Sequence, residues 1–468
     1  MKKIIGTISL LFLLFYTGCQ APETFKIQFD DTKEVSGQKF AIRDISPSLP
    51  ENWDDYNWVV LEYKISTAQR FHIGFTTDYG YNELRVMSYV PNAWNKLAIP
   101  LKFYRRLPDA ALDLATTFNQ PRYTGCINLG GQRGALHGVD SIGIRMRAPV
   151  GNPTFELRSI ALSVEDPGDE YLESRPAVDE FGQSNLVDYE DKIYSMEQLQ
   201  AEWASEENET VTTDAYHYST YGGYLQAQIK PTGFFRIEKV DGRWWFVDPE
   251  GYLFLSVGVD CVHPGGGGNA KWINERQGMF KELPPADLMI DSRNTGRKDT
   301  NSASFGIWNL YRRYGADYPQ KSKEMIIKRM DKWGINTIAN WSDREVMHMN
   351  QKAFMIPLPG TGMEAGLMGL ADIYDPAVVT KINESIRNFV EPYKDNPWLI
   401  GYFVGNEPAW LNQESRLCDI ILEGKDRPLK TELQTFLATG DTPERRIEFI
   451  YTTFESFLQT VKKNIKKV

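Results

Sequence analysis

The fold of this chain is decided by the stretch WLIGYFVGNEPAW, residues Trp398 to Trp410. Its first half, Leu399 to Val404, is a continuous apolar run, which is typical of a strand buried on both faces of a parallel sheet. A glycine ends the run, and the polar pair Asn406 and Glu407 follows. The dipeptide Asn-Glu occurs five times in the sequence, and only this copy follows a buried-strand pattern. A carboxylate is therefore predicted at the carboxyl end of a parallel strand.

Upstream of this stretch, apolar strands alternate with helical segments, the pattern of a parallel sheet built from βα units. We expect strands at Leu253–Val259, Ile335–Asn340, Ala353–Leu358 and Leu399–Val404, and helices at Lys323–Trp333, Asp343–Asn350, Pro376–Tyr393 and Pro443–Lys467. Residues 234–468 are thus predicted to form the first half of a (β/α)8 barrel, with Glu407 after the fourth strand. Catalytic groups converge at that end of the strands in such barrels.

A β-hairpin is predicted just before the first of these strands. Two apolar runs, Phe234–Ile237 and Trp244–Val247, flank the dipeptide Asp241-Gly242. Asp-Gly between apolar runs favours a tight two-residue turn. A second turn at residues 248–251 then leads the chain into the barrel.

Residues 20–166 have the pattern of an antiparallel β-sandwich of jelly-roll type, with about eight short strands and no convincing helix. Apolar and polar residues alternate cleanly, and between Leu157 and Ile160 the apolar phase slips by one, which predicts a β-bulge. Residues 167–233 are polar and acid-rich, and are predicted to be a linker. A capping-box pair, Ser195 and Gln198, predicts a short helix that ends at Trp203.

The N-terminus has the layout of a signal peptide. Lys2 and Lys3 precede an apolar run, Ile4 to Phe15, which is too short to span a membrane stably. Small residues stand directly before Cys19, as in a bacterial lipoprotein cleavage box. We therefore expect residues 1–19 to direct export and Cys19 to carry lipid, which would hold the protein at the cell envelope as an outer-membrane or surface lipoprotein. A plain secretory signal is the alternative.

Composition narrows the class of partner. The formal net charge is -10, and basic residues are scattered among acids, so nucleic acid is not an expected partner. The 12 Trp and 23 Tyr suit ligands such as sugars, which present C–H faces beside hydroxyls. The five histidines are scattered, and the cysteines other than Cys19 are far apart, so neither a metal site nor a disulfide framework is predicted. No cofactor is expected.

Two motifs carry a family resemblance. The stretch GRWWFVDPEG, residues 242–251, runs into LFLSVGV and resembles the start of the barrel in β-agarases of glycoside hydrolase family 50. The pair Asn406 and Glu407 resembles the Asn-Glu signature of clan A glycoside hydrolases, to which that family belongs. The resemblance implies a polysaccharide substrate, agarose or a related galactan, and cleavage of β-1,4 bonds with retention at the anomeric carbon.

The resemblance also implies roles for individual residues. Glu407 would be the general acid/base, because a strand-end carboxyl in a partly dry cleft can retain the proton that it donates to the glycosidic oxygen. Asn406 would hydrogen-bond the 2-hydroxyl of the sugar. Other substrate contacts are nominated by position alone, and ordinary packing or a loop location is the alternative for each: Trp410, Asp260, His263, Asn340 and Trp341.

A retaining hydrolase also needs a nucleophile, which in clan A lies at the end of the seventh strand. None of the acids after Glu407 can be nominated for that role. We therefore expect the chain to be a fragment, truncated after the fourth βα unit and inactive alone. Two other functions stay open. One is a surface glycan-binding lipoprotein whose platform is formed by Trp58, Tyr79, Tyr81 and Trp94. The other is a clan A enzyme for another β-glycan, such as a β-galactosidase or mannanase.

Overall fold

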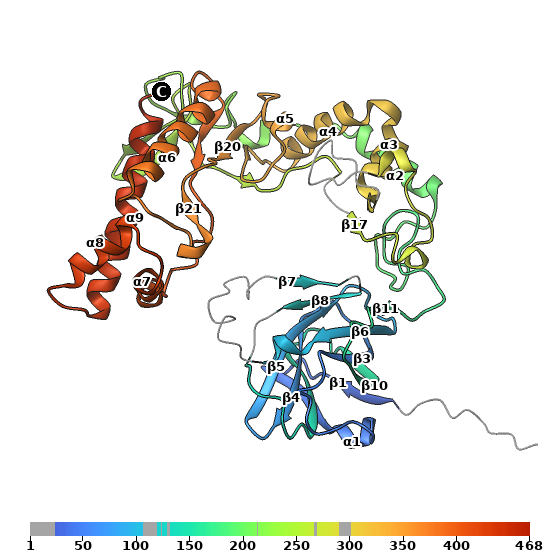
Figure 1. Cartoon of the computed structure of the whole chain (residues 1–468). Coiled ribbons are helices and arrows are strands. Elements are labelled where there is room, and N and C mark those ends of the chain that lie inside the picture. The colour runs from blue at the N-terminus through green and yellow to red at the C-terminus, as the bar shows by residue number, and fades with distance from the viewer. Residues whose placement is uncertain are drawn as a thin grey trace, which may run out of the picture. The chain divides into compact units, whose positions relative to one another are not determined.

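The computed structural model describes residues 24–105, 119–122, 124–128, 132–212, 214–265, 269–289 and 301–468. Cys19, the predicted lipidation site, lies outside these residues. The chain forms two compact units, and the division falls between Glu173 and Ser174. Figure 1 shows the strands of the first unit in blue to green and the elements of the second in green to red.

The first unit is a sandwich of two antiparallel sheets. One has five strands in the order β1-β10-β3-β6-β11 and the other has six in the order β2-β9-β4-β5-β8-β7. Among the described residues, two short helical turns, α1 (Ile42–Ile45) and the 3-10 turn η1 (Leu101–Phe103), interrupt the strands. The strands are β1 (Phe25–Gln28), β2 (Val35–Ala41), β3 (Trp58–Ile65), β4 (Phe71–Thr77), β5 (Gly80–Ser88), β6 (Asn95–Pro100), β7 (Asn119–Pro121), β8 (Gly125–Asn128), β9 (Ser141–Arg147), β10 (Thr154–Ser163) and β11 (Glu170–Tyr171).

The alternation of apolar residues places the core between the two sheets. Phe71, Ile73 and Phe75 of β4 are fully buried there, while polar neighbours point to the outer face, because successive side chains of a strand point to opposite sides. The pairing of β10 with β3 shifts register between Leu157 and Ser159. The predicted bulge is confirmed.

The predicted glycan platform is not formed as one surface. Trp58 and Trp94 belong with the five-stranded sheet, and each carries a cation over its ring: Arg122 over Trp58 and both Lys64 and Arg158 over Trp94. Tyr79 and Tyr81 lie instead at the turn and first residues of the β4–β5 hairpin in the six-stranded sheet. That prediction was wrong because the four rings are divided between the two sheets.

The second unit begins with the segment that was predicted to be a linker. Its helix, α2 (Met196–Asn208), starts at the predicted cap, where the Ser195 side chain accepts a hydrogen bond from the Gln198 amide. The helix runs past Trp203, the predicted end. Its last turns are held by ion pairs from Glu206 to Arg313 and Arg329, a tertiary interaction that local sequence does not reveal.

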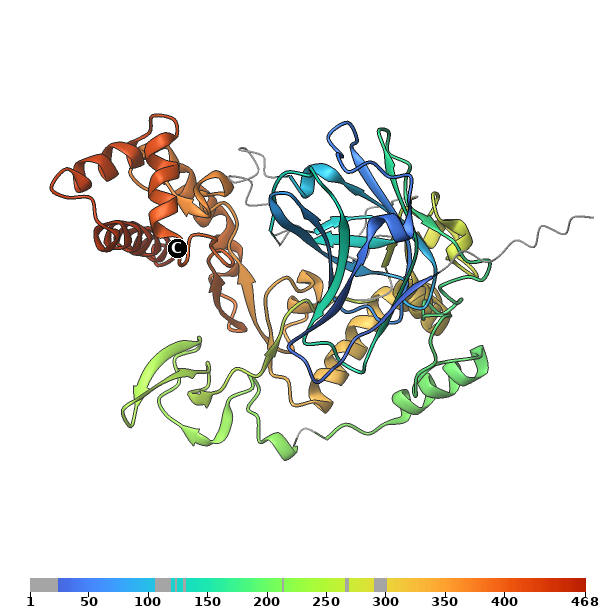
Figure 2. The same ribbon diagram turned by 90° about the horizontal axis from the view of Figure 1, so that it is seen from below.

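A small antiparallel sheet follows, with strand order β12-β15-β14-β13. Its strands are β12 (Tyr224–Gln228), β13 (Arg236–Val240), β14 (Arg243–Val247) and β15 (Tyr252–Phe254). Between β13 and β14, Asp241 and Gly242 both have positive φ, 48° and 81°, as a type I′ turn requires. The predicted hairpin is confirmed. In Figure 2 this sheet, drawn in yellow-green, lies apart from the red C-terminal helices.

The parallel sheet has four strands in sequential order, β16 (Gly258–Val259), β19 (Thr337–Ile338), β20 (Ala353–Pro357) and β23 (Leu399–Phe403). Each pairs in parallel with its neighbour. The strand predicted at Leu253–Val259 is divided in the structure. Its first residues pair with β14 in the small sheet, and only Gly258 and Val259 pair with β19.

Along the chain, helices separate the strands of the parallel sheet. They are α3 (Phe305–Tyr314), α4 (Tyr318–Lys332), α5 (Arg344–Met347) and α6 (Pro376–Val390). Three of them match predicted helices to within a few residues, whereas α3 was not predicted. The long stretch after His263 also contains a two-stranded sheet of β17 (Asn269–Lys271) and β18 (Ser302–Ser304), so it is more ordered than a loop.

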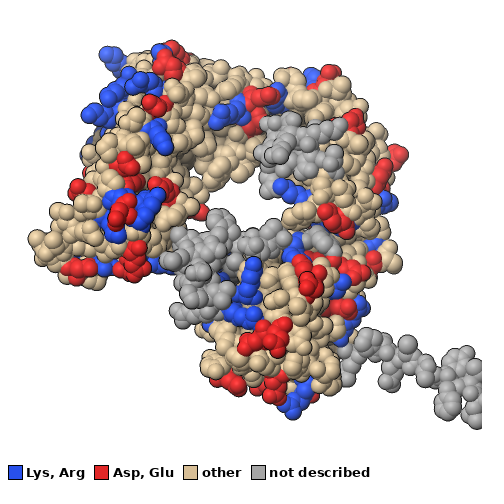
Figure 3. All heavy atoms as spheres, in the orientation of Figure 1, with Lys and Arg blue, Asp and Glu red and all other residues tan. Residues whose placement is uncertain are grey.

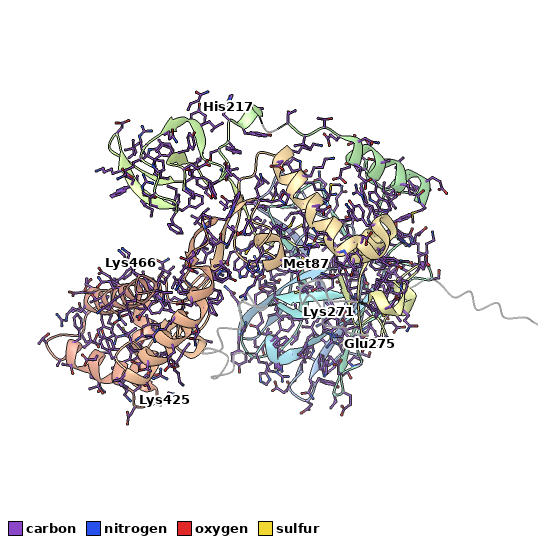
Figure 4. All side chains as sticks on the ribbon, turned by 90° about the horizontal axis from the view of Figure 1, so that it is seen from above. Met87, His217, Lys271, Glu275, Lys425 and Lys466 are labelled. Atoms are coloured by element: carbon purple, nitrogen blue, oxygen red, sulfur yellow. The ribbon has the colours of Figure 1, made fainter. Side chains whose placement is uncertain are left out.

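Three more helices follow the fourth strand: α7 (Glu414–Glu423), α8 (Pro428–Leu437) and α9 (Pro443–Ile465). Only α9 was predicted. They share a core with Trp410, formed by residues such as Leu417, Leu433 and Ile450. Lys425 and Lys466, labelled in Figure 4, mark this helical part of the unit.

The apolar run that leads into β16 is exposed to solvent. Leu255, Val257 and Val259 are 69%, 41% and 37% exposed, although their run reads as a buried strand. Among the described residues, neither β16 nor β23 pairs with a further strand. No helix of the described residues is long and apolar enough to cross a membrane. Acidic and basic side chains are interspersed on the face shown in Figure 3.

Candidate active site

The carboxyl ends of the four parallel strands lie along one edge of their sheet, and most of the nominated residues follow directly from these ends. Asp260 and His263 come after β16, Asn340 and Trp341 after β19, and Asn406 and Glu407 after β23. The arrangement follows from parallel pairing alone, because parallel strands point their carboxyl ends in the same direction.

Backbone hydrogen bonds hold the first two strand ends side by side. The Cys261 amide donates to the Asn340 carbonyl at 2.9 Å, and the Asp343 amide donates to the Val262 carbonyl at 2.8 Å. The Ser342 hydroxyl accepts a further bond from the Val262 amide at 3.0 Å. These bonds bring the segments that carry Asp260, His263, Asn340 and Trp341 together at one edge of the sheet.

Strained backbone marks the same edge. Cys261, Trp341 and Glu407 follow β16, β19 and β23, and their φ angles are 58°, 58° and 42°. Residues other than glycine rarely adopt this left-handed backbone conformation, because it costs them about 1–2 kcal/mol each. Such residues cluster at functional sites, where the surrounding structure fixes them. Cys261 was not nominated from the sequence, because no local pattern predicts its φ.

Glu407 lies at this edge, where its side chain is exposed. Its side chain makes no hydrogen bond or ion pair with the described residues, and the cap residue of the next helix, α7, is Gln413 rather than Asn406. In the described part of the chain, Glu407 has no basic partner and Asn406 does not cap a helix. The described residues also do not form a dry cleft over Glu407.

The loop that carries Glu407 rests on a hairpin from the third strand end, β21 (Met363–Glu364) and β22 (Leu370–Ala371). The Ala409 amide donates to the Met368 carbonyl at 3.0 Å. A Cβ added to Gly405 would lie 2.6 Å from Met363 Sδ, so the two segments are in close contact. Sequence analysis missed this hairpin. The glycine-rich run from 360 to 369 was its signal.

Two buried polar groups lie at the edge without partners. Asn340 is 5% exposed, and its Oδ1 accepts no hydrogen bond from described atoms; the same is true of His263 Nδ1. Buried polar atoms are usually hydrogen-bonded, and exceptions point to water or a ligand. Among the residues that the structure describes, no group of three or more His, Cys, Asp or Glu side chains is placed to hold a metal ion.

Trp410 is not at the surface. It is 1% exposed, and its ring packs edge-on against Tyr451 and Phe454 of α9, with ring centroids 5.4 and 5.2 Å away. Stacking on a sugar, one of the two roles considered for Trp410, is therefore incompatible with its position here. Trp341, by contrast, is 49% exposed and can reach a ligand.

The chain is similar in sequence to curated β-agarases. It is 26% identical to Beta-agarase B of Vibrio sp. strain JT0107 over 315 residues, which cover 59% of this chain and 33% of that protein. It is 27% identical to Beta-agarase A of the same strain over 264 residues, which cover 50% of this chain and 26% of that protein. The chain thus spans a third or less of these relatives. No protein-family model matches it.

Solved agarases share its fold. The agarase AgWH50C aligns with a TM-score of 0.56 and 20% identity over 93% of this chain and 70% of its own. The structures titled PfGH50B and an exo-beta-agarase give TM-scores of 0.55 and 0.54, each at 20% identity over 95% of this chain and 74% and 75% of theirs. The chain therefore shares its fold with these solved structures, two of which are titled as agarases, and it is similar in sequence to proteins named β-agarase.

Proposed function

We propose that this chain belongs to a retaining glycoside hydrolase of the β-agarase type, in which Glu407 is the general acid/base and the parallel sheet is the first half of a (β/α)8 barrel. The observation that carries the proposal is the exposed, unpaired carboxyl of Glu407 on a left-handed residue directly after the fourth parallel strand. Similarity to β-agarases supports the choice of a β-1,4-linked galactan as substrate.

In the proposed reaction, Glu407 donates its proton to the glycosidic oxygen while a carboxylate nucleophile attacks the anomeric carbon and the aglycone leaves. Glu407 then removes a proton from water, which displaces the nucleophile and restores both carboxyl groups. Asn406 orients the 2-hydroxyl, and Asn340 and Trp341 bind the sugar beside it. We propose no nucleophile among the residues of this chain.

The test uses the full gene product, including any residues encoded beyond Val468, with agarose as substrate and reducing ends as the readout. We expect Glu407→Gln to lower kcat by at least about 100-fold, the usual contribution of general acid/base catalysis. Glu423→Gln, a charge-matched change on α7, should retain activity. With an activated aryl β-glycoside, whose phenol leaves without acid assistance, Glu407→Ala should regain turnover when azide is added, and the products should be the phenol and a glycosyl azide, because azide attacks the glycosyl-enzyme without needing a general base. Full activity in Glu407→Gln would refute the assignment.

We also propose that Cys19 is lipidated and anchors the protein to the cell envelope. Radiolabelled palmitate should label the exported wild-type protein and not the Cys19→Ala variant, which should move to the soluble fraction. Equal labelling of both would show that the signal is not of the lipoprotein type.

A further inference from the structure

The outer face of the six-stranded sheet in the first unit contains a hollow of about 420 Å³ over β2, β9 and β5. Its walls include Lys39, Tyr81 and Arg145, and Gly37 and Gly143 lie in its floor. Lys39 is exposed and the Arg145 side chain is 32% exposed, so the hollow is open to solvent. It lies in a different unit from Glu407.

Glycines shape the hollow. The Tyr81 ring lies flat across two strands, because a Cβ at Gly74 would come within 2.3 Å of the ring and one at Gly143 within 2.5 Å of the Tyr81 hydroxyl oxygen. The hydroxyl donates to the Gly143 carbonyl at 3.2 Å. Burial, with the nearby Glu83 charge, raises the pKa of Tyr81 to about 12. The phenol therefore stays neutral and does not repel an anion.

Two cations converge on this ring. Lys39 Nζ lies 4.8 Å from the ring centroid and the Arg145 guanidinium carbon lies 5.8 Å from it. Arg145 pairs with the buried carboxylate of Glu83, with Nε to Oε2 at 2.6 Å. Lys39 hydrogen-bonds only the Thr76 hydroxyl, at 3.2 Å, and has no acidic partner among the described residues. One positive charge in the hollow is thus uncompensated.

The surroundings add positive charge rather than negative charge. His72, opposite Arg145 in the β4–β9 register and 6% exposed, has its pKa lowered by burial; the charge of Glu83 opposes the shift, and those of Arg145, Arg147 and Arg85 add to it. The charges of three arginines and of one carboxylate are thus felt at His72, so positive charge predominates around it. In a protein with net charge -10, such a patch is a local exception.

We propose that the hollow binds one oxyanion of an acidic polysaccharide, a sulfate ester or a carboxylate on a sugar ring, between Lys39 and Arg145. A lysine and an arginine give charge-assisted hydrogen bonds to such oxygens, and an open hollow suits a single substituent of a long chain. The overall acidity disfavours nucleic acids and anionic membranes, which need many contacts at once. The choice of a polysaccharide rests on the proposed function; the oxyanion site does not.

The test is affinity electrophoresis of the intact chain in native gels that contain κ-carrageenan, polygalacturonate or neutral agarose. We expect retardation in at least one acidic gel, with the sulfated and carboxylated polymers distinguishing the two oxyanions. Any retardation in agarose, which the proposed active site in the second unit can itself cause, should be the same for the wild type and Lys39→Met. Lys39→Met keeps the aliphatic stem and should weaken binding about tenfold, the usual loss for one charge-assisted bond. Lys33→Met, an equal change in charge at an exposed residue paired only with Asp30, should bind as the wild type does.

Three results would overturn the proposal: no retardation in either acidic gel, equal weakening by Lys39→Met and Lys33→Met, or weakening by Lys39→Met that is as large in neutral agarose as in the acidic gel. Urea unfolding of both variants ensures that folded proteins are compared, and Tyr81→Phe, which keeps the ring, provides a second variant that should weaken binding. Retardation does not depend on hydrolysis, so failure here is distinguishable from failure of the Glu407 assignment.

Discussion

The Cys261 amide donates a hydrogen bond of 2.9 Å to the Asn340 carbonyl, and each strand end that this bond joins carries a left-handed residue, Cys261 itself and Trp341. The bond continues the β16–β19 pairing past the last paired residues of those strands. It therefore fixes strained backbone at the edge where Glu407 also lies.

Relief of this strain is measurable at Cys261. Alanine keeps the cost of a left-handed residue, whereas glycine removes it and adds some entropy to the unfolded chain. We expect Cys261→Gly to be about 0.5–1 kcal/mol more stable than Cys261→Ala in urea unfolding. If alanine is the more stable of the two, Cys261 does not adopt a positive φ.

Gly405 is predicted to be intolerant of a side chain. Its φ is 73°, and an added Cβ would meet Met363 Sδ at 2.6 Å. We expect Gly405→Ala to lose about 1–3 kcal/mol of unfolding free energy, because both strain and overlap oppose it. Gly366→Ala, in the neighbouring hairpin, has open space around its Cβ and should change stability little. Equal effects would mean that the Glu407 loop and the hairpin are not packed together.

Trp410 should be a stability residue. Trp410→Ala removes a fully buried ring from the core shared with α9, and we expect a loss of about 3–5 kcal/mol. Trp244, which is 70% exposed, provides the control, and Trp244→Ala should cost far less. Urea unfolding is followed by circular dichroism, because removing a tryptophan changes the intrinsic fluorescence of the protein. If Trp410→Ala has wild-type stability, the ring is not part of the core, and a contact between Trp410 and sugar becomes possible again.

The docking of α2 should weaken in acid. Burial alone would raise the pKa of Glu206, but hydrogen bonds from Arg329 and Arg313 outweigh it and lower the pKa to about 2. Because the folded pKa is below the unfolded value of 4.5, this contribution is complete above pH 4.5 and is lost as the pH falls toward 2. Glu206→Gln should flatten stability over that window, measured by thermal unfolding. Glu202→Gln, an exposed change on the same helix, should leave the slope unchanged.

The exposed apolar run that leads into β16 should promote association. Leu255 and Val257 are exposed, so Leu255→Ser should cost little stability in this chain while removing a contact for self-association. We expect light scattering of the isolated 468-residue chain to show less aggregation in Leu255→Ser than in the wild type. A matched Leu61→Ser change, in the core of the sandwich, should instead unfold the protein. Identical scattering of wild type and Leu255→Ser would show that the exposed run at Leu255 does not drive association.

Local patterns in the sequence were sufficient for several elements. The turn at Asp241-Gly242, the bulge after Leu157 and the cap at Ser195 are correct because each depends on a few neighbouring residues whose φ, ψ or hydrogen bonds are set locally. The four parallel strands were also predictable, since continuous apolar runs that alternate with helices are typical of strands in a buried parallel sheet.

Other features needed the folded chain. The run from Leu253 to Val259 is apolar throughout, and nothing within it shows that β15 pairs with β14 while β16 pairs with β19. Helices α7 and α8 were missed because they are short and each is stabilised by the core that it shares with α9. The grouping of Tyr81 with Trp94 in one platform was wrong because strand alternation gives a side for each residue but not the sheet to which its strand belongs.

The sequence by itself determined the class of unit in each half of the chain and placed Asn406 and Glu407 after a parallel strand, because hydrophobic periodicity depends only on the residues within a segment. Only the tertiary structure decided that Trp410 is buried, that Cys261, Trp341 and Glu407 share left-handed backbone at one edge, and that Lys39 faces Arg145 across Tyr81. These features depend on contacts between residues far apart in the chain, and a short stretch of sequence holds no information about such contacts.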